Sequence, residues 1–224
     1  MGTMWTTSTA VDLAALGDTV APLVLAAERL LPVPDSLAGL FPEGGLVRGR
    51  TVACEGSAAT TLAMSLVASA LAAGSWLAMV DLPTVGLDAA RELGIPLERV
   101  VAVHTGDDLA RARRWPEVVA AAADGFDIII ARAPDGVAPS VARTVATRIR
   151  QRGAVLVLLG DPAAIPVDGA LRGSTVSWAG LGDGHGHLRE RRLTVDASGR
   201  RIPGRRSCDI TLPDAVVRTG PSAA

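Results

Sequence analysis

Short apolar runs alternate with helical segments through the middle of the chain, and this order restricts the possible folds more than any other feature. Leucine-rich and β-branched runs at about 51–54, 76–81, 99–103, 127–131 and 154–160 predict strands. Helical segments at about 60–73, 107–123 and 140–153, with a short one that ends at Gly94, separate them. Strands that are apolar along their whole length are typical of sheets buried on both faces. We therefore expect an α/β fold with a mainly parallel, doubly wound sheet.

The pattern changes after residue 174. Segments 174–181, 188–197 and 205–212 are strand-like and no helical segment separates them. A turn-rich stretch at 196–204 lies between the last two. This arrangement predicts an antiparallel extension of the main sheet. We expect the core to cover residues 35–212 and residues 213–224 to form a flexible tail.

The region before the core, residues 1–34, is expected to be an N-terminal helical arm. Asp18 is positioned to cap a helix over 20–31, and the proline at 22 falls in its first turn. Leu23, Ala27 and Leu30 share one face of that helix. An apolar face of this size predicts that the arm packs on the core or on a partner.

Composition excludes several kinds of chemistry. The 224 residues have a formal net charge of −1, and all 22 basic residues are arginine. The chain therefore has neither a P-loop lysine nor a Schiff-base lysine. Cys54 and Cys208 are expected to be buried thiols, and no cluster with metal-ligand spacing is present. No signal peptide is recognisable and the longest apolar stretch, 62–73, is too short to span a bilayer, which favours a cytoplasmic protein.

The block "GGLVRGRTVACEGSAATTLAMSLVASALAAGSWLAMVD" resembles the core of RecA-type ATPases. It has a short hairpin, a strand that enters a P-loop, the P-loop helix and a second strand that ends in an acid. "FDIIIA" matches the Walker B strand and "RERRLTVDASGRRIPGRRSCDITL" the late hairpin with its basic turn. The resemblance covers about 36–212 and implies a RecA-like P-loop fold. The segments "LAGLFPEGGLVRGR" and "GRRIPGRR" are most similar to ImuA-type mutasome accessory proteins.

The P-loop itself departs from its motif. G-x-x-x-x-G-K-[ST] provides backbone N–H groups for phosphate, a lysine, and a hydroxyl for magnesium. If Thr60 and Thr61 are aligned with the last positions, Ala58 and Ala59 replace the glycine and lysine. If Gly56 is aligned instead, Thr61 and Leu62 fill those positions, and again no lysine is present. The vestigial loop consists of Gly56, Ser57, Ala58, Ala59, Thr60 and Thr61.

Two further positions lack the residue that the family requires. The catalytic glutamate should follow the acid of the second strand, but Asp81 is followed by Pro83 at that spacing. The Walker B aspartate position holds Arg132. We expect no ATPase activity and no cofactor. The loop is then a strand-to-helix turn capped by a serine or threonine, with weak nucleotide or anion binding as the alternative. Asp81 is expected to cap the edge of the sheet.

An arginine cluster in the C-terminal hairpin is the strongest candidate for a surface role. Its members are Arg189, Arg191, Arg192, Arg200, Arg201, Arg205 and Arg206. Three interpretations remain open: a solvated hairpin, a surface for a protein partner, and contact with nucleic-acid phosphates. Arg200 and Arg201 lie at the turn and are expected to face solvent. The scarcity of aromatic residues argues against tight single-strand binding.

The resemblance implies a non-catalytic adaptor in damage-induced translesion synthesis. Such a protein would bridge RecA to the mutasome subunit ImuB, as a monomer or in a hetero-oligomer, with weak or indirect DNA contact. A SulA-like inhibitor of cell division that binds FtsZ is the alternative, and a slow ATP-dependent enzyme is a third class that the missing lysine argues against.

Overall fold

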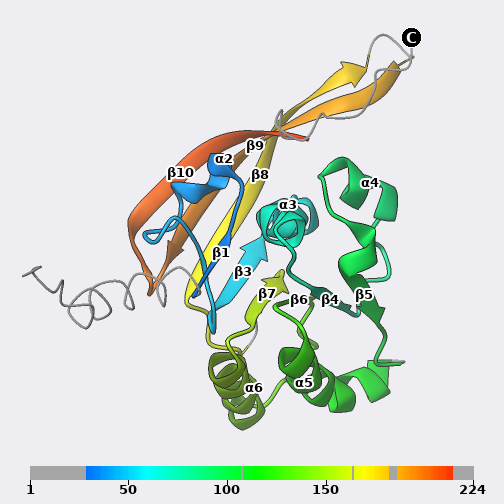
Figure 1. Ribbon diagram of the computed structural model, residues 1–224, viewed down its shortest axis with the longest axis vertical. Coiled ribbons are helices and arrows are strands. Elements are labelled where there is room, and N and C mark those ends of the chain that lie inside the picture. Colours follow the sequence, from blue (N-terminus) through cyan, green and yellow to red (C-terminus); the bar gives the residue numbers. More distant parts are fainter. Residues whose placement is uncertain (1–28, 107, 163, 182–185, 214–224) are drawn as a thin grey trace, which may run out of the picture.

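A computed structural model describes residues 29–106, 108–162, 164–181 and 186–213. Its main sheet has the strand order β10-β9-β8-β3-β7-β6-β4-β5 (Figure 1). The strands are β3 (Thr51–Glu55), β4 (Leu77–Val80), β5 (Val100–Val103), β6 (Ile128–Ala131), β7 (Val155–Leu159), β8 (Gly169–Leu181), β9 (Gly186–Gly199) and β10 (Ile202–Leu212). The pairs among β3 to β7 are all parallel.

Helices cover both faces of the parallel part of the sheet. They are α3 (Ala59–Ala72), α4 (Leu87–Glu92), α5 (Asp108–Gly125) and α6 (Pro139–Arg152), with a 3-10 turn η1 at Leu97–Arg99. Helices α5 and α6 pack together on one face, while α3 and α4 lie on the other (Figure 1). This is the doubly wound arrangement that the sequence predicts.

Side chains along each central strand alternate between two buried layers. In β6, Ile128 and Ile130 belong to the layer beneath α3, while Ile129 belongs to the layer beneath α5 and α6. All three are fully buried. Since both faces of the strand need an apolar residue at every position, the sequence reads as an unbroken apolar run.

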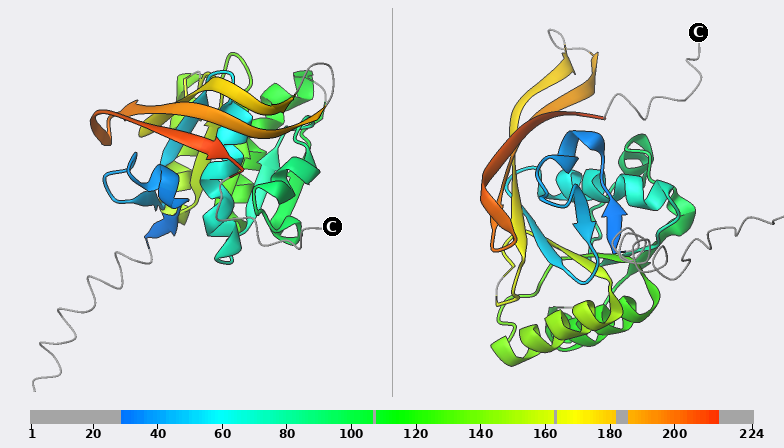
Figure 2. Two further views of the ribbon diagram at one scale, coloured as in Figure 1. Left: turned by 90° about the horizontal axis from the view of Figure 1, so that it is seen from above. Right: turned by 60° about the vertical axis from the view of Figure 1, so that its left-hand side comes forward.

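The C-terminal strands form the expected antiparallel extension. Strand β8 pairs in parallel with β3 and antiparallel with β9, and β9 pairs antiparallel with β10. These strands curve around α2 (Asp35–Ala38) and α3 (Figure 2). The predicted fold class, a parallel α/β sheet with an antiparallel extension, is confirmed.

The start of the described chain differs from the prediction. Leu30–Pro32 form strand β1, which pairs antiparallel with β2 (Gly45–Val47), whereas the sequence predicts a helix that continues to residue 31. Long-range backbone pairing and the burial of Leu31 override the local helical preference here. Leu23 and Ala27 of the predicted arm lie outside the described residues, as does the predicted tail after 213. Within the described part of the chain, no helix combines the length and the apolar character needed to cross a membrane.

Candidate functional site

The turn between β3 and α3 is where a RecA-like protein would bind phosphate. Only residues 56–58 connect the strand to the helix, whereas the phosphate-binding motif requires a longer loop. Gly56 has a φ of 87°, and a Cβ built there would lie 2.5 Å from the carbonyl oxygen of Gly173 in β8. The backbone of β8 therefore packs directly against the turn, which leaves a short, crowded connection.

The N-terminus of α3 differs from the prediction. Ala58 is the N-cap, so no side-chain hydroxyl caps the helix, and the predicted serine or threonine cap is wrong. The tight turn at Gly56 is closed by a hydrogen bond from the Ala59 amide to the Gly56 carbonyl, and the helix begins at Ala59. As a result, Ser57 lies outside the helix and Thr61 lies within its first turn.

The side chain of Arg191, in β9, reaches across to this turn. Its Nη1 donates to the Thr61 hydroxyl at 3.1 Å and its Nη2 to the Ser57 carbonyl at 3.3 Å. Its Nε donates to Thr175 Oγ1 at 3.0 Å, and the guanidinium lies 4.6 Å from the ring centre of Trp178. Burial lowers the pKa of Arg191, although an arginine keeps its charge at any physiological pH.

These contacts place a guanidinium of the same chain against the β3–α3 turn. The two loop residues that hold the guanidinium, Ser57 and Thr61, belong to the vestigial P-loop. Sequence reasoning assigned Arg191 to a partner surface. Alternation along β9 could have predicted an inward direction for this side chain. Leu193 and Val195 are buried, and Arg191 lies two and four positions before them, on the same face of the strand.

The other two positions that the sequence compares with the catalytic motifs also have structural contacts. Asp81 is buried with a φ of 55°, and its carboxylate accepts hydrogen bonds from the backbone amide and hydroxyl of Thr105 at 2.9 and 2.7 Å. This confirms the prediction that Asp81 caps the sheet's edge. Arg132 follows β6 and is exposed. Its Nη1 lies 3.4 Å from where a Cβ at Gly160 would be. Glu55, which the sequence did not single out, pairs with Arg172 at 2.6 Å.

The arginine cluster does not form one patch. Arg191 and Arg200 are separated by nine positions along β9, which corresponds to roughly 30 Å at about 3.3 Å per residue. At the turn end, Arg200 pairs with Asp168 at 2.8 Å and Arg205 with Asp196 at 3.2 Å. Arg206 donates to the Gly39 carbonyl at 2.9 Å. Arg200 is exposed at the turn, as expected, with a side-chain exposure of 65%, and its guanidinium also ties the turn to Asp168.

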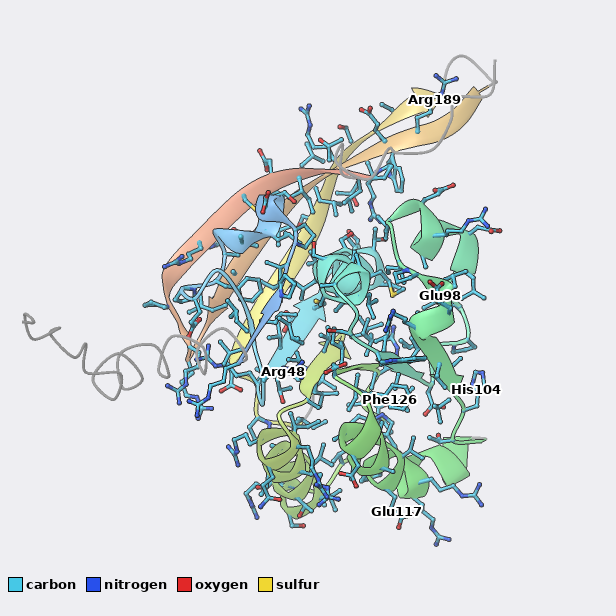
Figure 3. All side chains as sticks on the ribbon, in the orientation of Figure 1. Arg48, Glu98, His104, Glu117, Phe126 and Arg189 are labelled. Carbon is cyan, nitrogen blue, oxygen red and sulfur yellow. The ribbon has the colours of Figure 1, made fainter. Side chains whose placement is uncertain are left out.

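The exposed arginines that remain lie at both ends of the hairpin. Arg189 is near the outer end of the β8–β9 ribbon, which projects from the rest of the sheet (Figure 3). Arg192 is exposed near it, and the same ribbon exposes Val176 and Trp178. Arg201 is exposed at the opposite end, beside the turn. This division separates a ribbon surface from a turn surface.

Comparisons with known proteins agree with this architecture. A curated relative, "Uncharacterized protein Rv3395c" of Mycobacterium tuberculosis, is 32% identical over 138 residues, which are 61% of this chain. The chain spans 65% of that relative's length. Among solved structures, the RadB recombinase is similar with a TM-score of 0.54 at 14% identity, covering 79% of this chain and 92% of that one. The flagellar accessory protein FlaH from Methanocaldococcus jannaschii has a TM-score of 0.53 at 14% identity, covering 82% and 93%.

These structural neighbours establish the fold as RecA-like, as the resemblance implied. The family model described as the MT3502 N-terminal domain matches residues 39–165, which contain the vestigial P-loop, the capped acid Asp81 and Arg132. The match covers more than half of the chain, from just after α2 to the loop that follows β7. The chain therefore belongs to the MT3502 N-terminal domain family and folds as a RecA-like domain.

Proposed function

We propose that this protein is a non-catalytic RecA-like adaptor of the ImuA type, which bridges RecA and ImuB in damage-induced translesion synthesis. The observation that carries the proposal is the contact of Arg191 with Ser57 and Thr61. A RecA-like domain whose phosphate turn holds one of its own side chains is suited to binding partners rather than to turning over nucleotide.

The chemistry around the turn supports the absence of catalysis. A nucleotide would have to displace Arg191 from three acceptor groups and separate it from Trp178. It would then meet a turn without lysine, and Asp81, the acid at the end of β4, is already hydrogen-bonded to Thr105. Neither phosphate charge neutralisation nor water activation has the residues that these steps need.

Nucleotide assays test this part of the proposal. We expect no phosphate release from ATP with magnesium, with or without single-stranded DNA. We also expect millimolar ATP to leave the melting temperature almost unchanged. The measurement is sensitive, because a ligand at 100 times its Kd would add about 2.7 kcal/mol of stability. The variant Arg191→Ala should behave in the same way. Magnesium-dependent phosphate release that Thr61→Ala abolishes would contradict the proposal.

Partner capture tests the adaptor role itself. The exposed ribbon arginines are the best candidates for contact with an acidic partner surface, since arginine pairs bidentately with carboxylates. We expect the protein to retain RecA and ImuB, and the double variant Arg189→Glu with Arg192→Glu to weaken at least one complex. The double variant Arg113→Glu with Arg114→Glu, on the exposed side of α5, is the matched control for charge. Capture of FtsZ in place of RecA and ImuB would instead support the SulA-like alternative.

Salt dependence separates protein contact from DNA contact. A surface that neutralises phosphates releases counterions, so its affinity falls steeply with salt concentration. We expect any binding of single-stranded DNA to be weak and abolished at moderate salt, while the protein complexes persist. DNA binding that outlasts the protein complexes would make nucleic acid the principal partner and contradict the adaptor proposal.

A further inference from the structure

An apolar groove of about 420 Å³ runs along α3 on the face opposite α5 and α6. Besides α3, it is lined by the segment before α2 and α2 itself, by the end of α4 and by the last residues of β10. Val33, Leu37, Ala68, Ala72, Leu93 and Leu212 are among the lining residues. This groove is separate from the contacts of Arg191.

The floor of the groove suits a helix. Ser65, Ala68, Ser69 and Ala72 of α3 face it. Their spacing of three and four positions places these small side chains in one stripe along the helix. Small side chains let a second helix approach closely, and the larger Val33, Leu37 and Leu93 stand beside the stripe as walls. The surface is therefore shaped for a short apolar helix rather than for a polar ligand.

The chain supplies a segment of matching character. Residues 19–28 read TVAPLVLAAE, in which Val20, Leu23, Val24 and Ala27 share one helical face. No lysine or arginine precedes Arg29. Asp18 is the predicted N-cap and marks where such a helix starts.

Chain geometry brings this segment within reach of the groove. The Arg29 carbonyl accepts a hydrogen bond from the Arg48 amide, so the segment ends beside β2. From there β1 leads to Val33 at the rim of the groove, over roughly 13 Å at about 3.3 Å per residue. A helix over residues 18–28 is roughly 16 Å long at about 1.5 Å per residue. A helix of this length that turns back at residue 29 therefore reaches the rim of the groove.

We propose that residues 19–28 form a helix that docks its apolar face, Val20, Leu23, Val24 and Ala27, into this groove of the same chain. Docking covers the apolar lining and the apolar face together. It also makes the N-terminal arm part of the RecA-like core instead of a free partner-binding element. The proposal does not depend on the adaptor role, because it concerns only contacts within one chain.

Hydrogen exchange on the full chain tests the docking. We expect the backbone amides of residues 23–28 to exchange at least tenfold more slowly than in a peptide of residues 1–29, because a docked helix protects its hydrogen bonds. Leu23→Asp should abolish this protection. Leu25→Asp, on the opposite face of the same helix, should retain it. Equal loss in the two variants, or no protection in the wild-type chain, would overturn the proposal.

Changes on the groove side give an independent measurement. Ala68→Trp fills the floor and should release residues 23–28, whereas Ala73→Trp, an exposed neighbour that does not line the groove, should not. If Ala68→Trp fails to fold, the Leu23→Asp comparison still decides the question. Protection that disappears on dilution would assign the groove to a second copy. Protection of residues 214–224 that Ala68→Trp removes would assign it to the C-terminal segment, and either result would overturn the proposal.

Discussion

At the scale of single residues, arginines close in sequence have different roles. Arg191 is held by the vestigial P-loop and Arg200 by Asp168, while Arg189 and Arg201 are exposed. The same residue type therefore serves fold and surface within one hairpin. Which role each arginine has depends on the acceptor that the tertiary structure places opposite it.

The turn arginines give a matched pair for testing this division. Asp168 accepts from Arg200 and also from the backbone amide of Thr51 at 3.1 Å, which ties the turn to β3. Arg200→Asp places two carboxylates together and should lower the free energy of unfolding by about 1 kcal/mol, a small value because the pair is exposed. Arg201→Asp, which loses only an attraction to Glu43 and no ion pair, should lower it less. Urea denaturation measures both, and an equal effect of the two substitutions would argue against a specific role for the Arg200 pair.

The two thiols should differ in reactivity. The sequence predicts that both are buried, but Cys208 is only half-buried because it lies on edge strand β10. Burial raises the pKa of both thiols, and that of the fully buried Cys54 is raised far more. Since the thiolate is the reactive form, we expect a thiol reagent at about pH 8 to modify Cys208 slowly and Cys54 only on unfolding. Mass spectrometry of timed samples measures this, with Cys208→Ser as the control, and rapid labelling of Cys54 in the native chain would contradict it.

At the scale of elements, the β3–α3 turn depends on close contact with β8. Gly56 adopts a left-handed φ and packs on the Gly173 carbonyl, so Gly56→Ala meets both backbone strain and collision. We expect it to cost about 2 kcal/mol or more. Gly136→Ala is the control, because Gly136 has a φ of 74° with open space around it, and its cost should be about 1 kcal/mol. Thermal unfolding of both variants gives the comparison, and equal costs would show that β8 does not constrain the turn.

Strand β8 also shows how an element can escape sequence analysis. The sequence predicts a strand from 174, whereas β8 begins at Gly169. Residues 169–173 include Gly169 and Gly173, which have little intrinsic strand preference. The strand forms there because its backbone pairs with β3 from Val52 to Glu55. Glycine suits position 173 because a side chain there would crowd Ala58 and Leu62.

At the scale of the whole molecule, paired carboxylates set the response to acid. Hydrogen bonds from Arg148 and from Arg205 hold the pKa of Asp124 and of Asp196 below the ordinary value of 3.8. For Glu43, burial alone would raise the pKa, but the bond from Arg50 and nearby positive charges lower it below 4.5. A carboxyl whose pKa is lowered on folding stabilises the fold above its unfolded pKa, and this contribution is lost as pH falls through the folded pKa.

We therefore expect the melting temperature to change little between about pH 6 and 8 and to fall below about pH 4.5. Circular dichroism melts across that range measure it. Asp124→Asn removes one of the carboxylates and should make the acid decline shallower, while Asp88→Asn, at an exposed acid in the first turn of α4, should not. A melting temperature that stays constant from about pH 5 to 3 would contradict the role of these pairs.

The sequence alone determined the order of strands and helices in the core, the doubly wound class and the lack of a P-loop lysine. These properties follow from apolar periodicity and residue identity, which are local and can be read along the chain. Only the tertiary structure decided that Leu30 belongs to a strand, that Arg191 contacts the β3–α3 turn and that Arg200 pairs with Asp168. Each of these depends on a partner from 17 to 130 positions away, and local propensity carries no information about which distant acceptor a backbone or guanidinium will meet.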